Sequence, residues 1–165
     1  MPRPKLLVLN GPNLGILGRR EPGVYGRLTL SELNARVEAQ ADLLGFDCDF
    51  RQHDGEGELV AALNHADEEG FVGIIFNPGA YTHYSIALLD AVAACAAPAI
   101  EVHLSNIFAR EPFRRRSVTA KAATGFIAGL GANAYELAVQ AIARLLSEES
   151  TTHKSTTHDK STTHA

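Results

Sequence analysis

The sequence contains no tryptophan, one methionine and two cysteines among its 165 residues. Cys48 and Cys95 lie in segments with an apolar pattern and show no CxxC spacing, so we interpret both as small core residues. The sequence therefore predicts neither a disulfide framework nor a zinc site.

Long apolar runs are also absent, since no stretch approaches the roughly 20 residues needed to cross a bilayer. Residues 1–5 lead directly into a strand-like segment and lack the apolar region and cleavage site of a signal peptide. We therefore expect a cytoplasmic protein that does not associate with membranes. The net charge of −4 and pI of about 5.9 argue against a nucleic-acid-binding protein, which is normally basic on one face.

The chain length and a hydrophobic content of 45% are typical of a single soluble domain, which we expect to cover residues 1–147. Residues 148–165 form a polar near-repeat of Ser-Thr-Thr-His and offer nothing apolar to bury, so we expect them to be disordered. We interpret this segment as a solvated tail; weak metal binding through its histidines is the alternative.

Strand and helix signals alternate along the chain. Lys5–Asn10 is a continuous apolar run typical of a strand buried on both faces. Thr29–Leu44 carries a capping box, one apolar stripe and a closing glycine, which indicate a helix. The other expected strands are Phe46–Arg51 at a sheet edge, Val72–Phe76, Ala99–His103 and Gly125–Ala128, and the other expected helices are Glu58–Glu69, Ser85–Ala96 and Ala132–Leu146.

Five βα units predict an α/β fold: a flavodoxin-like three-layer sandwich with a five-stranded parallel sheet of order 2-1-3-4-5 and helices on both faces. In such a sheet, ligands bind beyond the carboxyl ends of strands 1 and 3, with strand 4 next along. The site is therefore expected in the segments that follow these three strands.

Polar side chains are concentrated in those segments. They are Asn13, Arg20 and Tyr25 in a long glycine-rich linker after strand 1, Asn77 and His83 after strand 3, Glu101, His103 and Ser105 around the end of strand 4, and Arg110 and Arg114 in the following loop. Guanidinium groups match carboxylates, whereas amides, serine and histidine suit hydroxyl groups. The sequence thus predicts a small polyhydroxylated carboxylic acid as ligand; a solvated basic patch at residues 114–116 is the alternative for the arginines.

Tyr25 and His103 are the candidates for proton transfer. Tyrosine is ordinarily a poor base, but adjacent cations such as Arg20 favour the phenolate. His103 follows Glu101 on a strand, and a histidine oriented by a carboxylate is a competent acid. A base on a movable lid facing an acid on a fixed strand supports elimination of water. Taken singly, Tyr25 would be interpreted as a packing anchor, and Asn13 and Asn77 as turn formers.

Several segments carry a resemblance to a known family. They are residues 9–15 (LNGPNLG), 20–26 (REPGVYG), 77–83 (NPGAYTH), 101–106 (EVHLSN), 109–114 (AREPFR) and 125–131 (GFIAGLG). In this order they resemble the type II 3-dehydroquinate dehydratases, and the likeness spans residues 5–146. Tyr84, Phe108 and Arg116 depart from that family's usual residues, which affects contacts at the rim of the site.

The resemblance implies a role for each site residue. Tyr25 would take the proton as an enolate forms, Arg20 would activate it, Asn13 would hold the enolate oxygen through a water, and His103, oriented by Glu101, would protonate the departing hydroxyl. The substrate would be bound by Asn77, His83, Arg114 and the backbone of Leu104 and Ser105, with Asp90 reaching toward a neighbouring subunit's site. The resemblance further implies the substrate 3-dehydroquinate, no cofactor or metal, and trimers assembled into a homododecamer.

Rival functions lack the residues they need. An imine-forming dehydratase needs a lysine in the site, whereas Lys5 and Lys121 belong to the entry side of the sheet and the other two lysines to residues 148–165. A non-catalytic flavodoxin-like binding module is the alternative; a flavin carrier would need a hydroxyl-rich loop after strand 1, and a signalling receiver an aspartate where Asn77 stands. Residues 129–134 match a dinucleotide fingerprint, but no further strand follows, so we interpret these glycines as close packing.

Overall fold

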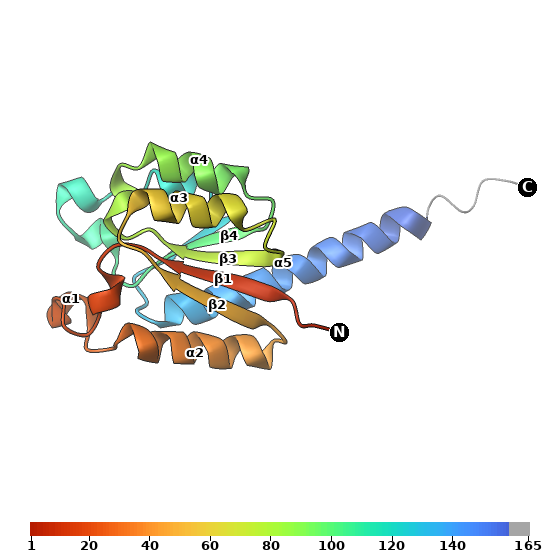
Figure 1. The fold of residues 1–165 in the computed structure, drawn as a ribbon, viewed down its shortest axis with the longest axis horizontal. Helices are drawn as coiled ribbons and strands as arrows, with labels where there is room; N and C mark the ends of the chain where they lie inside the picture. Colours follow the sequence, from red (N-terminus) through yellow and green to blue (C-terminus); the bar gives the residue numbers. More distant parts are fainter. Residues whose placement is uncertain (159–165) are drawn as a thin grey trace, which may run out of the picture.

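The computed structural model describes residues 1–158, with side chains through residue 153, and contains one parallel sheet in the order β2-β1-β3-β4-β5 (Figure 1). The strands are β1 (Lys5–Asn10), β2 (Asp47–Gln52), β3 (Phe71–Asn77), β4 (Ala99–His103) and β5 (Gly125–Ala128). The helices are α1 (Pro22–Tyr25), α2 (Leu30–Leu43), α3 (Glu56–His65), α4 (Ile86–Ala94) and α5 (Asn133–His158). The predicted fold class, strand order and edge position of β2 are confirmed.

Two hydrophobic clusters lie on opposite faces of the sheet. Because successive strand residues point to opposite faces, Leu6 and Val8 of β1 pack with α2 and α5, whereas Leu7 and Leu9 pack with α3 and α4. Figure 1 shows these helix pairs above and below the sheet. All four β1 side chains are fully buried, as a continuous apolar run predicts.

Helix α2 begins at the predicted capping box. The backbone N–H of Glu32 donates to Thr29 Oγ1 over 3.2 Å, and the Thr29 N–H donates to the Glu32 carboxylate over 3.0 Å. Both bonds satisfy donors that the first turn leaves unpaired. Gly45, at φ +83°, lets the chain leave the helix and enter β2.

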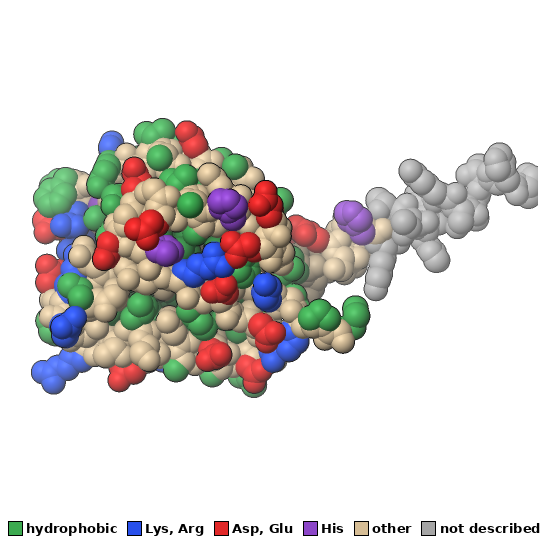
Figure 2. Space-filling model, viewed as in Figure 1, with side chains coloured by type: hydrophobic (Ala, Val, Ile, Leu, Met, Phe, Trp, Pro, Cys, Tyr) green, Lys and Arg blue, Asp and Glu red, His purple; other side chains and the backbone are tan. Residues whose placement is uncertain are grey.

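Helix α5 differs from the expectation of a domain end near Ser147, because the helix continues to His158. Figure 1 shows its last turns extending away from the body of the protein, and in Figure 2 the coloured part of the helix already projects from that body. Beyond the last fully buried residue, Ile142, hydroxyl side chains return to carbonyls four residues earlier: Ser147 to Ala143, Ser150 to Leu146, Thr151 to Ser147 and Thr152 to Glu148. Helical structure in residues 148–158 therefore differs from the predicted disorder, and it is held by local hydrogen bonds rather than burial. The rest of the predicted tail, 159–165, lies outside the described residues.

The cysteines behave as small apolar residues. Cys48 and Cys95 are half-buried against the two core clusters and form no disulfide. Burial raises the pKa of each thiol to about 11, which keeps both in the unreactive protonated form. Over residues 1–158, none of the helices is long and apolar enough to cross a membrane.

Candidate active site

A cavity opens at the carboxyl ends of β1, β3 and β4, at the predicted switch point of the sheet. It is lined by Pro12, Leu14, Arg20, Tyr25, Asn77, Gly79, Ala80, His83, His103, Leu104, Ser105, Ile107, Arg110 and Arg114. These residues come from the linker after β1, the 3₁₀ turn Gly79–His83 after β3, the end of β4 and the loop after it. The structure thus brings most of the predicted site residues to one place.

Tyr25 reaches the cavity from the single-turn helix α1 in the lid, which we define as residues 11–28. Two left-handed backbone positions, Glu21 at φ +37° and Gly26 at φ +74°, bracket this turn and aim the tyrosine inward. Nη1 of Arg110 donates a hydrogen bond to the Tyr25 phenolic oxygen over 3.0 Å. The guanidinium carbon of Arg20 instead lies 4.9 Å from the centre of the Tyr25 ring. Both cations lie at the Tyr25 ring, but of the two only Arg110 is bonded to its oxygen.

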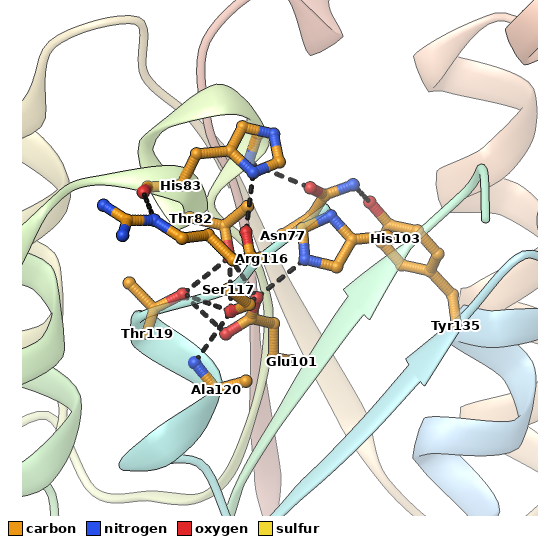
Figure 3. Close-up of polar contacts among 11 residues, drawn as sticks. Asn77, Thr82, His83, Glu101, His103, Arg116, Ser117, Thr119, Ala120 and Tyr135 are labelled. Atoms are coloured by element: carbon orange, nitrogen blue, oxygen red, sulfur yellow. Dashed lines mark hydrogen bonds and ion pairs between the residues drawn. The ribbon is translucent and has the colours of Figure 1, made fainter. Parts of the chain in front are cut away.

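His103 and Glu101 form a buried pair on β4, with exposed fractions of 5% and 1% (Figure 3). The His103 Nε2–H donates to the Glu101 carboxylate over 2.7 Å. Burial opposes the charge of Glu101, but the hydrogen bond and charge of His103, together with hydroxyl hydrogen bonds, outweigh it and hold the pKa of Glu101 below its usual value. This bond fixes the imidazole and leaves Nδ1 as the nitrogen available to the cavity.

Asn77 is held by a buried amide–phenol–amide chain. Asn77 Oδ1 accepts from the Gly79 N–H over 3.0 Å, so its Nδ2 donates to the Tyr135 hydroxyl over 2.8 Å (Figure 3). That hydroxyl donates in turn to Asn10 Oδ1 over 2.6 Å. The bonds of Asn77 Nδ2 and of the Tyr135 hydroxyl therefore run in one direction, toward Asn10. Burial raises the pKa of Tyr135, which therefore stays a neutral donor.

His83 is fixed by the segment around Arg116. Nδ1 of His83 donates to the Arg116 carbonyl over 2.7 Å, and Nε of Arg116 donates back to the His83 carbonyl over 3.1 Å. Burial, partly offset by the Arg116 contact, lowers the pKa of His83. The neutral ring leaves Nε2 as an acceptor for a ligand hydroxyl.

The cavity floor is formed by the backbone that follows β4. The Gly129 N–H donates to the His103 carbonyl over 3.3 Å, and the Gly131 N–H donates to the Leu104 carbonyl over 2.9 Å. Gly129, at φ +89°, packs against Asn106 so closely that a β-carbon would lie 3.0 Å from the Asn106 Cβ. Close packing therefore accounts for Gly129, whereas a β-carbon at Gly131 would meet no atom within 4 Å, and its φ of +59° is what favours glycine there.

Arg114 is the cation at the outer wall of the cavity. Its Nε lies 3.3 Å from the Glu111 carboxylate. The ion pair steadies the guanidinium while leaving its planar fork for a ligand anion.

Three predicted site residues do not line the cavity: Glu101 lies buried behind His103, and Asn13 and Asp90 are exposed elsewhere. Asn13 is exposed in a left-handed conformation at φ +68°, and its N–H donates to Asp54 over 2.9 Å. Its neighbours Pro12 and Leu14 line the cavity, but Asn13 does not. Asp90 is exposed on α4 and is also absent from the lining. The expected role of Asp90 toward a neighbouring subunit stays a prediction.

Arg110 is the residue that the sequence analysis left without a role. It lies in the loop that was expected to carry arginines into the site, so a signal existed. Two 3₁₀ turns, Ile107–Ala109 and Pro112–Arg114, set the path of the loop that carries Arg110. Because this path is not evident from the sequence, the sequence did not predict which arginine bonds the Tyr25 phenol.

Comparisons with known proteins agree with this arrangement. The model of the family Dehydroquinase class II matches residues 4–143. The 3-dehydroquinate dehydratase of Thermus thermophilus is 54% identical over 141 residues, covering 86% of this chain and 95% of the relative, and that of Sinorhizobium medicae is 54% identical over 140 residues, covering 85% and 94%.

Solved structures show the same likeness. The type II dehydroquinase from Propionibacterium acnes superimposes with a TM-score of 0.82 at 46% identity, covering 87% of this chain and 98% of that one. The type II dehydroquinase from Butyrivibrio crossotus gives a TM-score of 0.83 at 38% identity, covering 85% and 97%. With the fold, the site and the relatives in agreement, this chain belongs to the class II dehydroquinases.

Proposed function

We propose that this chain removes water from 3-dehydroquinate by general acid/base catalysis through an enolate, with Tyr25 as base and His103 as acid. As a class II dehydroquinase it is a lyase of the shikimate pathway, and its product is 3-dehydroshikimate. The observation that carries the assignment of roles is that the Tyr25 phenol and the His103 imidazole border one cavity.

The first step is proton removal from the carbon beside the ketone. Tyr25 acts as phenolate, stabilised by the hydrogen bond from Arg110 and by the charge of Arg20 above its ring. The electron pair of the broken C–H bond moves to the ketone oxygen and forms the enolate. We propose that Asn13 holds the enolate oxygen through a water. This role requires a movement of the lid that turns the exposed Asn13 side chain toward the cavity.

The second step expels the hydroxyl group. The enolate collapses back to the ketone, a carbon–carbon double bond forms next to it, and the carbon–oxygen bond of the leaving hydroxyl breaks. His103 donates its Nδ1 proton to that oxygen, so water departs. Glu101 remains ionised throughout and compensates the positive charge of the imidazolium.

Binding residues orient the substrate between the two proton-transfer groups. Arg114 pairs with the substrate carboxylate. Neutral His83 accepts from a ring hydroxyl, while Asn77 and the backbone of Leu104 and Ser105 contact the remaining polar groups. A substrate held by several such contacts loses little further translational and rotational entropy on reaching the transition state, so its orientation in the site contributes to the rate.

Residue placement supports the enolate route over imine formation and over non-catalytic binding. Of the described lysine side chains, Lys5 begins β1 and Lys121 lies in a 3₁₀ turn before β5, and neither lines the cavity. A non-catalytic flavodoxin-like module would have no need for a phenol and an imidazole that share one cavity with three arginines.

We further propose that the protein works as a homo-oligomer, built as trimers assembled into a dodecamer. Asp90 is exposed on α4, where it is free to approach a neighbour's site, and Tyr84 and Ile86 nearby are 60% and 59% exposed. Apolar side chains exposed this far are typical of surfaces that another subunit covers. Light scattering on the purified protein gives the assembly size, and a monomeric mass at full activity would contradict this proposal.

The test of the mechanism is an ultraviolet assay for the conjugated enone product, run without added metal or cofactor. Wild-type protein is expected to turn over 3-dehydroquinate, and Tyr25→Phe and His103→Ala are each expected to lower kcat by roughly 10²–10⁴. Borohydride added with the substrate is expected to leave the activity intact, because no imine forms. Near-normal turnover by Tyr25→Phe would refute its role as base.

A further inference from the structure

We infer that Thr82, Ser117 and Thr119 are positioning residues that hold Glu101 in its ionised form and thereby fix His103 as the acid. This inference rests on the proposed role of His103. Thr82 and Ser117 donate hydroxyl hydrogen bonds to Glu101 Oε1 over 2.5 and 2.8 Å, and Thr119 donates to Oε2 over 2.7 Å. Figure 3 shows the three hydroxyl groups gathered around the Glu101 carboxylate, which His103 also contacts. We call these three residues the hydroxyl clamp.

The hydroxyl clamp is assembled from two segments far apart in the sequence. Thr82 belongs to the 3₁₀ turn after β3, whereas Ser117 and Thr119 precede β5. The Val118 N–H donates to the Thr82 carbonyl over 2.7 Å and ties these segments together. Thr82 and Thr119 have no exposed surface. Full burial of hydroxyl groups is costly unless each one is bonded, and the carboxylate supplies the shared acceptor.

Proton counting favours the ionised carboxylate. Each hydroxyl carries one proton, and an ionised carboxylate accepts all three together with the Nε2–H of His103. A protonated Glu101 would add a fourth hydroxyl proton to the cluster and would weaken the acceptor of the Nε2–H. The strand neighbours of Glu101 are the apolar Phe76 on β3 and Phe126 on β5, and among the described residues His103 is the one titratable group hydrogen-bonded to it.

The clamp acts on catalysis through His103. With both carboxylate oxygens bonded, Glu101 has one orientation, and the imidazole that donates to it has one orientation as well. Nδ1 is then held in one position before the substrate arrives, so the acid needs little reorganisation when the hydroxyl leaves. Loss of a clamp hydroxyl would let the carboxylate rotate or take a proton, and either change would misdirect the acid.

The experiment compares Thr82→Val and Thr119→Val, which remove a hydroxyl at nearly constant volume, with Thr82→Ser and Thr119→Ser, which retain it. The valine variants are expected to lose about tenfold or more in kcat, as for a lost hydrogen bond to a charged group, with little change in KM. The serine variants should recover most of the rate. Because the hydroxyl bonds hold the pKa of Glu101 low, their removal raises it, and the acidic limb of the kcat profile should move to higher pH.

Thr124→Val is the matched control. Its hydroxyl lies in the same segment and accepts from the Ala99 N–H over 3.1 Å, without contact to Glu101. It should leave kcat and the pH profile unchanged even if it lowers the melting temperature. If a valine variant fails to fold, Ser117→Ala tests the same clamp at its least buried position.

Valine variants with wild-type kcat and an unmoved acidic limb would overturn the inference, and so would an equal loss in the serine variants. Failure of the proposed mechanism looks different: it would appear as full activity in His103→Ala, measured in parallel. A fall in melting temperature with unchanged kcat would assign the clamp to stability and would also overturn its positioning role.

Discussion

The phenolic oxygen of Tyr25 and the guanidinium of Arg110 meet at 3.0 Å although 85 residues separate them in the sequence. Tyr25 belongs to the lid after β1, and Arg110 to the loop after β4. Their contact lies at the cavity that His103 also lines, and it joins the two longest loops at the carboxyl edge of the sheet. The hydrogen bond to Tyr25 raises the pKa of Arg110, so the guanidinium beside the phenolic oxygen stays charged.

Replacing Arg110 should therefore reduce the supply of phenolate. We expect Arg110→Met to lower kcat by about 10²-fold, in the range for loss of one preorganised electrostatic contact, and Arg110→Lys to lower it less because the charge remains. Steady-state kinetics measure both. Arg19→Met serves as control, since Arg19 is exposed in the same lid and does not line the cavity. Equal kcat for Arg110→Met and wild type would leave Arg20 as the residue that activates Tyr25.

The sequence predicted the sheet and the location of the site because both depend on local patterns. Apolar runs indicated the strands, and the alternation of strand and helix signals along the chain indicated a parallel sheet. The strand order then predicted that the segments after β1, β3 and β4 lie together. The capping box of Thr29 and Glu32 is a local signal of the same kind. Such features need no knowledge of tertiary contacts.

Features that depend on loop paths and long-range contacts were not predicted. Asn13 was expected in the site, but a left-handed backbone turns it outward to meet Asp54. Tyr135 was part of an expected helix, and nothing in that helix pattern indicates that its hydroxyl bridges Asn10 and Asn77. The extension of α5 was missed because its serines and threonines were interpreted by composition, whereas their hydroxyls bond to the helix itself.

The Tyr135 bridge can be tested by Tyr135→Phe. Removal of its hydroxyl leaves Asn77 Nδ2 and Asn10 Oδ1 buried without partners, and each such group costs about 1–3 kcal/mol. We expect a clear fall in the urea midpoint and in the melting temperature, together with a raised KM as Asn77 loses its fixed orientation. Tyr84→Phe, which removes the hydroxyl of an exposed tyrosine, is the control. Unchanged stability in Tyr135→Phe would mean that a water replaces the hydroxyl.

The protonation state of the His83 ring predicts that KM depends on pH. Burial lowers the pKa of this histidine below its ordinary value of 6.5, so the ring is neutral at pH 7 and its Nε2 accepts from the substrate. As the pH falls through the lowered pKa, protonation turns Nε2 into a donor, and KM should rise. KM should stay level above pH 7.

His83→Asn separates this effect from other titrations. Asparagine does not titrate, so its KM should be higher at pH 7 but nearly constant down to pH 5. Initial rates at a series of substrate concentrations and pH values give both profiles. A rise in KM at low pH that is the same in His83→Asn would assign the titration to another group.

Arg114 offers a direct test of carboxylate binding. Arg114→Ala should raise KM by about 10- to 100-fold, the range for a lost hydrogen bond to a charged group, with a smaller effect on kcat. Arg144→Ala, on the distant helix α5, is a control for the loss of one positive charge. Raising the salt concentration should increase the wild-type KM modestly, because screening weakens the pairing of charges. An unchanged KM in Arg114→Ala would indicate a contact with another subunit instead.

Truncation can test whether the last turns of α5 are needed for folding and activity. Within the part of the chain that the structure describes, no residue after Ser147 lines the cavity, and residues 148–153 are exposed. A chain ending at Ser147 should therefore keep its kcat, its KM and nearly all of its thermal stability, since surface turns that bury no apolar side chain contribute little. A chain ending at Leu137 is the contrasting variant, because it loses Ala138, Val139 and Ile142 from the core cluster beneath α2 and should not fold. If the chain ending at Ser147 instead lost activity while remaining folded, residues 148–165 would have a part in assembly, and light scattering on the same sample would show the change in mass.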